Sequence, residues 1–163
     1  MKKLLTVLLL SSISLGLFAK SYPFMIRHSY DVQVVRVANQ GEKFYKVLSE
    51  AGSVNKAIDQ AMQDAVVASL FFGVQGTEHA GSVPPICGSI KTYEEHRDYF
   101  DTFFKKGEFM QYVRNVNSQY PSGENNVRTR KGHRVGLYVV VKYDALRKKM
   151  ENDGIIKSLN NYF

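Results

Sequence analysis

One predicted helix constrains the fold of this chain more than any other feature. It runs from Val54 to about Phe72, with Ser53 as a plausible N-cap and Gly73 as its end. Small side chains recur on one stripe of it, and a stripe of this kind allows the helix axis to lie close to a neighbouring layer. The stripe consists of Ala57, Ala61, Ala65 and Ala68. We therefore expect this helix to pack against a sheet.

A β-hairpin is predicted directly before the helix. Tyr30–Ala38 alternates between apolar and polar residues with a one-residue phase slip, which indicates a β-bulge or a strand covered on both faces. Asn39–Gly41 is a turn signal, and Lys43–Ser49 is a second strand of high β propensity. The helix and this hairpin together predict a sheet with a helix on one face.

The remainder of the chain adds strands and helices in an order that excludes an alternating parallel fold. The predicted elements are a helix from Tyr93 to Lys106, a strand from Phe109 to Asn117, a hairpin of Val127–Arg130 and Arg134–Lys142, and a helix from an N-cap at Asp144 to Gly154. The apolar stretch Val135–Val141 is the expected central strand. The predicted class is α+β, an antiparallel sheet of about five strands with two to three helices packed on one face.

The N-terminus has the plan of a cleavable signal peptide. Lys2 and Lys3 precede an apolar stretch, and Ala19 supplies a small residue at the expected cleavage point. An uncleaved anchor is the alternative, but about 15 apolar-biased residues are short for a bilayer span of roughly 20. We expect residues 1–19 to be removed and residues 20–163 to form one domain that is exported to the periplasm or the outer membrane.

The charge balance favours acidic partners. The chain has 22 Lys and Arg against 15 Asp and Glu; removal of Lys2 and Lys3 leaves 20 against 15, a net charge of +5. This charge suits an envelope protein or an anionic surface, with peripheral membrane association as one form of it. Nucleic acid fits the charge but not the expected compartment, so no nucleic-acid partner is predicted.

Two stretches also resemble a known group of proteins. They are Lys43–Val47 leading through Ala57–Ala61 to Asp64–Val66, and Gly136–Val141 leading through Lys142–Lys149 to Gly154–Lys157. Together they resemble a family of small secreted proteins of uncharacterised activity from Gram-negative envelopes. The helix-on-hairpin plan is more distantly similar to the N-terminal module of flagellar assembly protein T and related outer-membrane accessory lipoproteins. The resemblance implies a location near secretion or surface-assembly machinery, and no chemistry. It does not cover Gly76–Lys91.

Chemical motifs give weak signals. Cys87 lies in a loop between Pro84-Pro85 and Gly88-Ser89, outside any recognisable nucleophile signature; we expect an ordinary half-buried thiol, with pairing between chains as an alternative. His79 and His96 lack the short spacing of metal ligands. No metal, cofactor or catalytic residue is predicted. A secreted hydrolase using Cys87 and a soluble carrier of an apolar ligand remain the alternatives.

One cluster of basic residues is a candidate interaction site. It gathers on two predicted neighbouring strands and their turn, with Arg128 and Arg130 on one face. Protection of a sheet edge is one interpretation, and a docking patch for an acidic partner is the other. The candidate partner-binding residues are Arg114, Arg128, Arg130, Lys131 and Arg134. We also expect the aromatic residues to form a contact surface. Together with the basic cluster, this surface predicts a non-enzymatic accessory protein that binds other envelope proteins.

Overall fold

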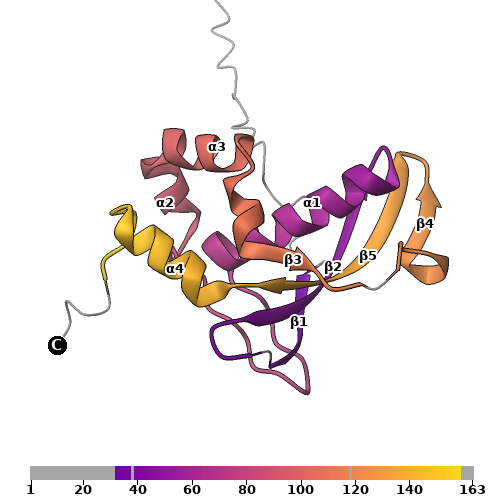
Figure 1. The fold of residues 1–163 in the computed structure, drawn as a ribbon, viewed down its shortest axis with the longest axis horizontal. Coiled ribbons are helices and arrows are strands. Elements are labelled where there is room, and N and C mark those ends of the chain that lie inside the picture. Colours follow the sequence, from indigo (N-terminus) through magenta and orange to yellow (C-terminus); the bar gives the residue numbers. More distant parts are fainter. Residues whose placement is uncertain (1–31, 38, 118, 159–163) are drawn as a thin grey trace, which may run out of the picture.

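The computed structural model describes residues 32–37, 39–117 and 119–158 (Figure 1). The predicted signal peptide, residues 1–19, lies outside them. The elements are β1 (Val32–Val37), β2 (Lys43–Ala51), α1 (Val54–Val67), η1 (Ala68–Phe72), α2 (Ile90–Glu95), α3 (Arg97–Lys105), η2 (Glu108–Tyr112), β3 (Val113–Asn115), η3 (Gly123–Asn125), β4 (Asn126–Thr129), β5 (Gly132–Val141) and α4 (Tyr143–Asn152). The predicted α+β class is confirmed.

The sheet is antiparallel, with the order β1-β2-β5-β3. β5 pairs with β2 along one edge, and its other edge is shared: β3 pairs with Val139–Val141, whereas β4 pairs with Gly132–Val135. The prediction that Val135–Val141 forms the central strand is therefore confirmed. The one-residue slip is also confirmed, as a bulge in β1 between Val34 and Arg36.

The inner face of the sheet packs against α1, as the alanine stripe predicted. Ala61 and Ala65 are fully buried, and so are Val47 of β2 and Leu137 of β5, which are register partners. Apolar side chains on every second residue of a strand share one face, so a single alternation supplies this core.

Both ends of the first helical segment follow local rules. The Ser53 side chain accepts a hydrogen bond from the backbone N–H of Lys56 at 3.4 Å. The chain leaves helical geometry at Gly73, which has φ +72°; a Cβ there would lie 2.7 Å from the Val83 carbonyl oxygen. The last turn, η1, is a π-helix rather than α-helix.

The second predicted helix is interrupted. His96 adopts φ −120° and ψ 37°, which ends α2 and begins α3 in a new direction. Both short helices direct aromatic rings to the same place: Tyr93 and Phe100 are fully buried, with centroids 6.1 Å apart. Burial of the rings therefore outweighs the continuity of the helix.

Two further boundaries were predicted wrongly. The first half of the predicted strand Phe109–Asn117 is the 3-10 helix η2, because Phe109 packs on Phe104 with centroids 5.5 Å apart. Asp144 is not an N-cap; Lys142 holds that position, and Asp144 lies in the first turn, where its backbone N–H donates to the Gly41 carbonyl at 3.0 Å. The predicted end of α4 is confirmed, since the Ile155 N–H donates to the Met150 carbonyl at 2.9 Å.

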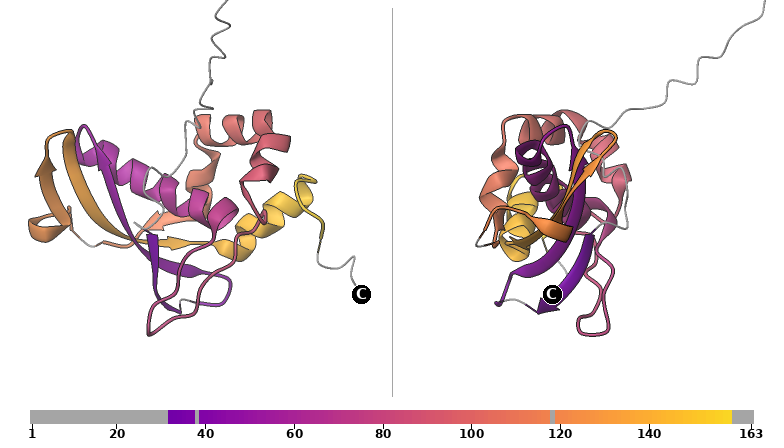
Figure 2. Two further views of the ribbon diagram at one scale, coloured as in Figure 1. Left: turned by 180° about the vertical axis from the view of Figure 1, so that it is seen from behind. Right: turned by 90° about the vertical axis from the view of Figure 1, so that its right-hand side faces the viewer.

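We call α2, α3 and η2, with Phe71 of η1, the aromatic lobe. It lies on the same side of the sheet as α1, and at the opposite end of the molecule from β4 (Figures 1 and 2). Its rings form near-perpendicular pairs, among them Phe71–Phe100 at 4.8 Å and Tyr99–Phe100 at 5.1 Å. The lobe extends the core beyond the sheet.

Candidate interaction surface on the β4–β5 hairpin

The β4–β5 hairpin has a short turn, formed by Arg130 and Lys131. Gly132 follows at φ +141°, and a Cβ at this position would lie 2.2 Å from the Ala51 carbonyl oxygen. Only glycine fits both the backbone angle and the space. The turn is thereby held against the end of β2, and Arg130 and Lys131 at the tip are exposed.

The structure brings four of the five candidate residues together. Arg128 pairs in register with His133, and Arg134 pairs with Val127. These two arginines belong to opposite faces of the hairpin, because neighbouring register pairs alternate between faces. Arg130 lies in the turn rather than on β4, so the strand alternation that predicted a shared face with Arg128 does not extend to it. All four cationic side chains, including Lys131, are exposed.

Arg114 does not belong to this cluster. β3 and β4 pair with different parts of β5, so Arg114 lies beside Val140, six residues along β5 from Arg134. Its guanidinium pairs with the Glu42 carboxylate at 3.2 Å. The sequence suggested neighbouring strands because it did not show that one long strand would pair with both short ones.

Side-chain hydrogen bonds also link the hairpin to β2 and its two strands to each other. The Thr129 hydroxyl donates to Glu50 at 2.6 Å, and His133 Nδ1 lies 3.0 Å from the Asn126 side-chain oxygen. Glu50 is thus engaged by Thr129. Within the described ranges, Arg128, Arg130 and Lys131 make no ion pair with an acidic side chain.

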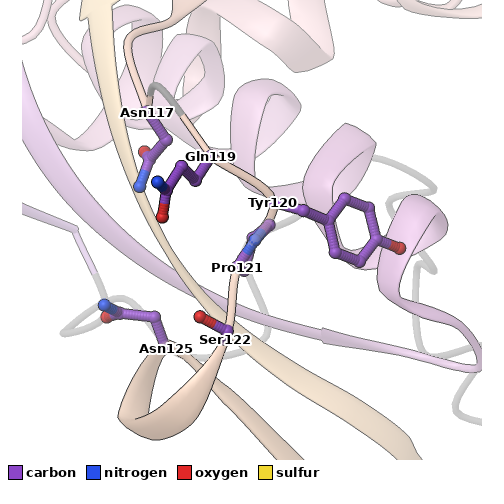
Figure 3. Close-up of a pocket in the computed structure, with 6 residues that line it drawn as sticks. All are labelled: Asn117, Gln119, Tyr120, Pro121, Ser122 and Asn125. Atoms are coloured by element: carbon purple, nitrogen blue, oxygen red, sulfur yellow. The ribbon is translucent and has the colours of Figure 1, made fainter.

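A pocket lies beside the hairpin, between β3 and β4 (Figure 3). Its volume is about 250 Å³, and its lining carries amides, a hydroxyl and one aromatic ring: Asn117, Gln119, Tyr120, Pro121, Ser122 and Asn125. The Asn117 side chain accepts the Tyr138 N–H at 2.7 Å, on the edge of β5 that lies between its pairings with β3 and β4. The Asn125 side-chain oxygen leaves no space for a Cβ at Gly136. The residues that line the pocket therefore cover part of the edge of β5.

Cys87 is buried more deeply than expected. It is 7 % exposed, its N–H donates to the Leu70 carbonyl at 2.8 Å, and burial raises the pKa of its thiol to about 12, although Arg147 acts in the opposite direction. A nucleophilic cysteine requires a lowered pKa and access to substrate. Among the described residues, no three His, Cys, Asp or Glu side chains gather as a metal site.

The aromatic residues of Tyr93–Phe109 do not form the contact surface that the sequence suggested. Tyr93, Phe100 and Phe103 are at most 1 % exposed, and Phe104 and Phe109 are also buried. They serve as the core of the aromatic lobe. The described part of the chain has four exposed large apolar side chains. Phe72 and Met110 lie at the margin of the lobe, whereas Tyr120 and Val127 lie outside it.

Comparison of the chain with protein-family models, with curated proteins and with solved structures found no match. The resemblance to envelope proteins therefore stays a prediction. In the described residues, no helix has the length and apolar character required to cross a membrane.

Proposed function

We propose that the protein is an exported, non-enzymatic accessory protein of the cell envelope that binds an acidic envelope protein through the tip of its β4–β5 hairpin. The observation that supports this proposal best is the set of three cations at the tip. Arg128, Arg130 and Lys131 are exposed and make no ion pair with any described acidic residue.

The shape of the hairpin supports a role in docking. It stands at the end of the molecule away from the aromatic lobe (Figure 1), and glycine packing holds its turn against β2. A rigid tip loses little conformational freedom on binding. Exposed cations on such a tip accelerate the encounter with an acidic partner more than they add affinity.

Edge protection is the competing explanation, because β4 pairs on one side only, with β5. The two explanations differ in what a loss of charge would do. If the tip is a docking site, a variant without these charges should lose its partner and stay soluble. If the charges protect the sheet edge, the variant should keep its partner and begin to self-associate.

The test replaces Arg128, Arg130 and Lys131 together by Ser in the mature protein. Immobilised wild type and variant are incubated with solubilised envelope proteins at about 0.05 M and about 0.3 M salt, across the range where screening becomes strong. We expect a discrete set of proteins to be retained by the wild type at low salt and lost in the variant. The control replaces Lys105, Lys106 and Lys148, which are exposed away from the hairpin, by Ser.

Equal retention by the hairpin variant and the wild type would overturn the proposal. If light scattering also showed aggregation of that variant alone, edge protection would be the role of these charges. Loss of retention in the control variant to the same extent would show an effect of net charge with no particular docking surface.

A further inference from the structure

The outer face of the sheet, opposite α1, carries a second arrangement of charges and rings. Strand register places Arg36 beside Phe44, Phe44 beside Val140, and Val140 beside Arg114. This row crosses β1, β2, β5 and β3, so at a strand spacing of about 4.8 Å its two arginines lie roughly 14 Å apart. The row has a cation at each end and apolar side chains between them.

A second row runs parallel to the first. Lys46 of β2 pairs with Tyr138 of β5. The rings of the two rows are nearly parallel: the centroids of Phe44 and Tyr138 are 5.8 Å apart, with an interplanar angle of 10°. The Arg36 guanidinium lies 4.9 Å from the Phe44 centroid, and Lys46 Nζ lies 5.8 Å from the Tyr138 centroid. Each of these two cations is therefore held against a ring.

The bulge in β1 creates this arrangement. Val34 pairs with Tyr45 on the inner face, and without a bulge the next residue, Val35, would pair with Phe44. The extra residue shifts the register so that Arg36 takes that place. A bulge often re-aims a side chain in this way. The arginine that the alternation of β1 would direct toward the core is thereby presented beside an outer-face ring.

Most of this face is accessible in the described structure, but Val140 within it is buried. Phe44, Lys46 and Tyr138 are partly exposed, whereas their inner-face neighbours Tyr45 and Val139 are fully buried. Arg36 and Lys46 make no ion pair with a described acidic side chain; Arg114 is paired with Glu42. α1 and the aromatic lobe lie on the other side of the sheet (Figure 2).

We infer that this outer face, which we call the Phe44–Tyr138 face, binds an acidic polysaccharide. Arg36 and Lys46 would contact carboxylates, and the partly exposed rings of Phe44 and Tyr138 would contact the C–H faces of sugar rings. Small molecules bind in concave pockets, whereas a face four strands wide suits an extended polymer. Among polyanions, single-stranded nucleic acid also uses aromatic rings and cations, but the export predicted from residues 2–19 favours a glycan of the cell surface.

The inference shares with the proposed function only the expected export, and the two surfaces are tested separately. Binding of the mature protein to polygalacturonate is measured by retardation in native affinity gels or by calorimetry. Dextran supplies neutral sugar rings, poly-L-glutamate supplies carboxylates without sugar rings, and a single-stranded oligodeoxynucleotide supplies bases and phosphates. We expect polygalacturonate to bind about tenfold more tightly than poly-L-glutamate, a difference of about 1.4 kcal/mol, and dextran to bind weakly.

The matched variants locate the site. The double variant Arg36→Gln with Lys46→Gln should weaken polygalacturonate binding about tenfold, and Tyr138→Leu should weaken it less. The control, Lys105→Ser with Lys106→Ser, removes the same charge elsewhere and should change the affinity by no more than about twofold. Equal losses in both double variants would overturn the inference. The inference would also be overturned if the wild type bound poly-L-glutamate or the oligonucleotide more tightly than polygalacturonate. This comparison does not depend on the folding of a variant. The hairpin variant should retain glycan binding, so failure of the proposed function is distinguishable from failure of this inference.

Discussion

The aromatic lobe and the β4–β5 hairpin use their side chains in opposite ways. In the lobe, large rings pack on one another and most of them are buried, with Met110 as the exposed apolar side chain. In the hairpin, β4 has partly or fully exposed residues throughout, and cations surround the turn. A region whose side chains are buried contributes stability, whereas a region with exposed charges is free to contact other molecules. This difference is why the hairpin, and not the lobe, is the candidate for docking.

The largest expected effect tests whether the aromatic lobe is part of the core. Phe100 is fully buried, and its ring contacts Phe71, Tyr93 and Tyr99. Phe100→Ala should destabilise the protein by about 3–5 kcal/mol, because it removes apolar contacts and leaves a cavity. Chemical denaturation measures the loss. A change below about 1 kcal/mol would mean that the lobe contributes little and its rings are available for binding.

A smaller effect is expected beneath α1. Ala61→Leu and Ala65→Leu should each destabilise the protein by about 1–3 kcal/mol, because both alanines are fully buried against the sheet and a larger side chain would overpack this contact. The denaturation midpoint is the measurement. The matched control is Gln63→Leu, a partly exposed position on the same helix, which should change the midpoint much less. Equal midpoints for all three variants and the wild type would contradict the packing of α1.

Local patterns predicted most of the fold. The alanine stripe, the cap at Ser53 and the hairpin turn before Lys43 each depend on residues close together in the sequence, and the structure confirms them. The helix break at His96 and the 3-10 helix before Val113 depend instead on where distant rings meet, which spacing along the chain does not show.

The candidate sites illustrate the same division. The charges of the hairpin tip could be predicted, since they are adjacent in sequence. The separation of Arg114 from them could not, because it follows from the pairing of β5 with both β3 and β4. The Phe44–Tyr138 face was missed altogether: its residues come from distant parts of the chain, and the phase slip in β1 was the one available signal.

The smallest expected effect lies at the rim of the lobe, where α3 meets α4. The Tyr99 hydroxyl donates to the Asp153 carboxylate at 2.5 Å, and Lys149 Nζ lies 2.7 Å from the same oxygen. Burial would raise the pKa of Asp153, but the hydrogen bonds from Lys149 and Tyr99 outweigh it and hold that pKa below its usual 3.8. The contact joins residues 54 positions apart, so it fastens the lobe to the end of α4.

A carboxyl whose pKa is lower in the folded state stabilises the protein above its unfolded pKa, and this contribution is lost as the pH falls through the folded value. Asp153→Asn should therefore lower the free energy of unfolding at pH 7 by at most about 1 kcal/mol, since the group is largely solvated. The difference from the wild type should shrink as the pH falls below 3.8. Denaturation at several pH values measures it. Tyr99→Phe, which keeps the ring, should reproduce only part of the loss, and Glu95→Gln, which removes the long 3.9 Å pair with Lys91, should show little. The prediction would be contradicted if the difference in the free energy of unfolding between the wild type and Asp153→Asn grew as the pH fell. The ionised carboxylate would then destabilise the contact between the lobe and α4.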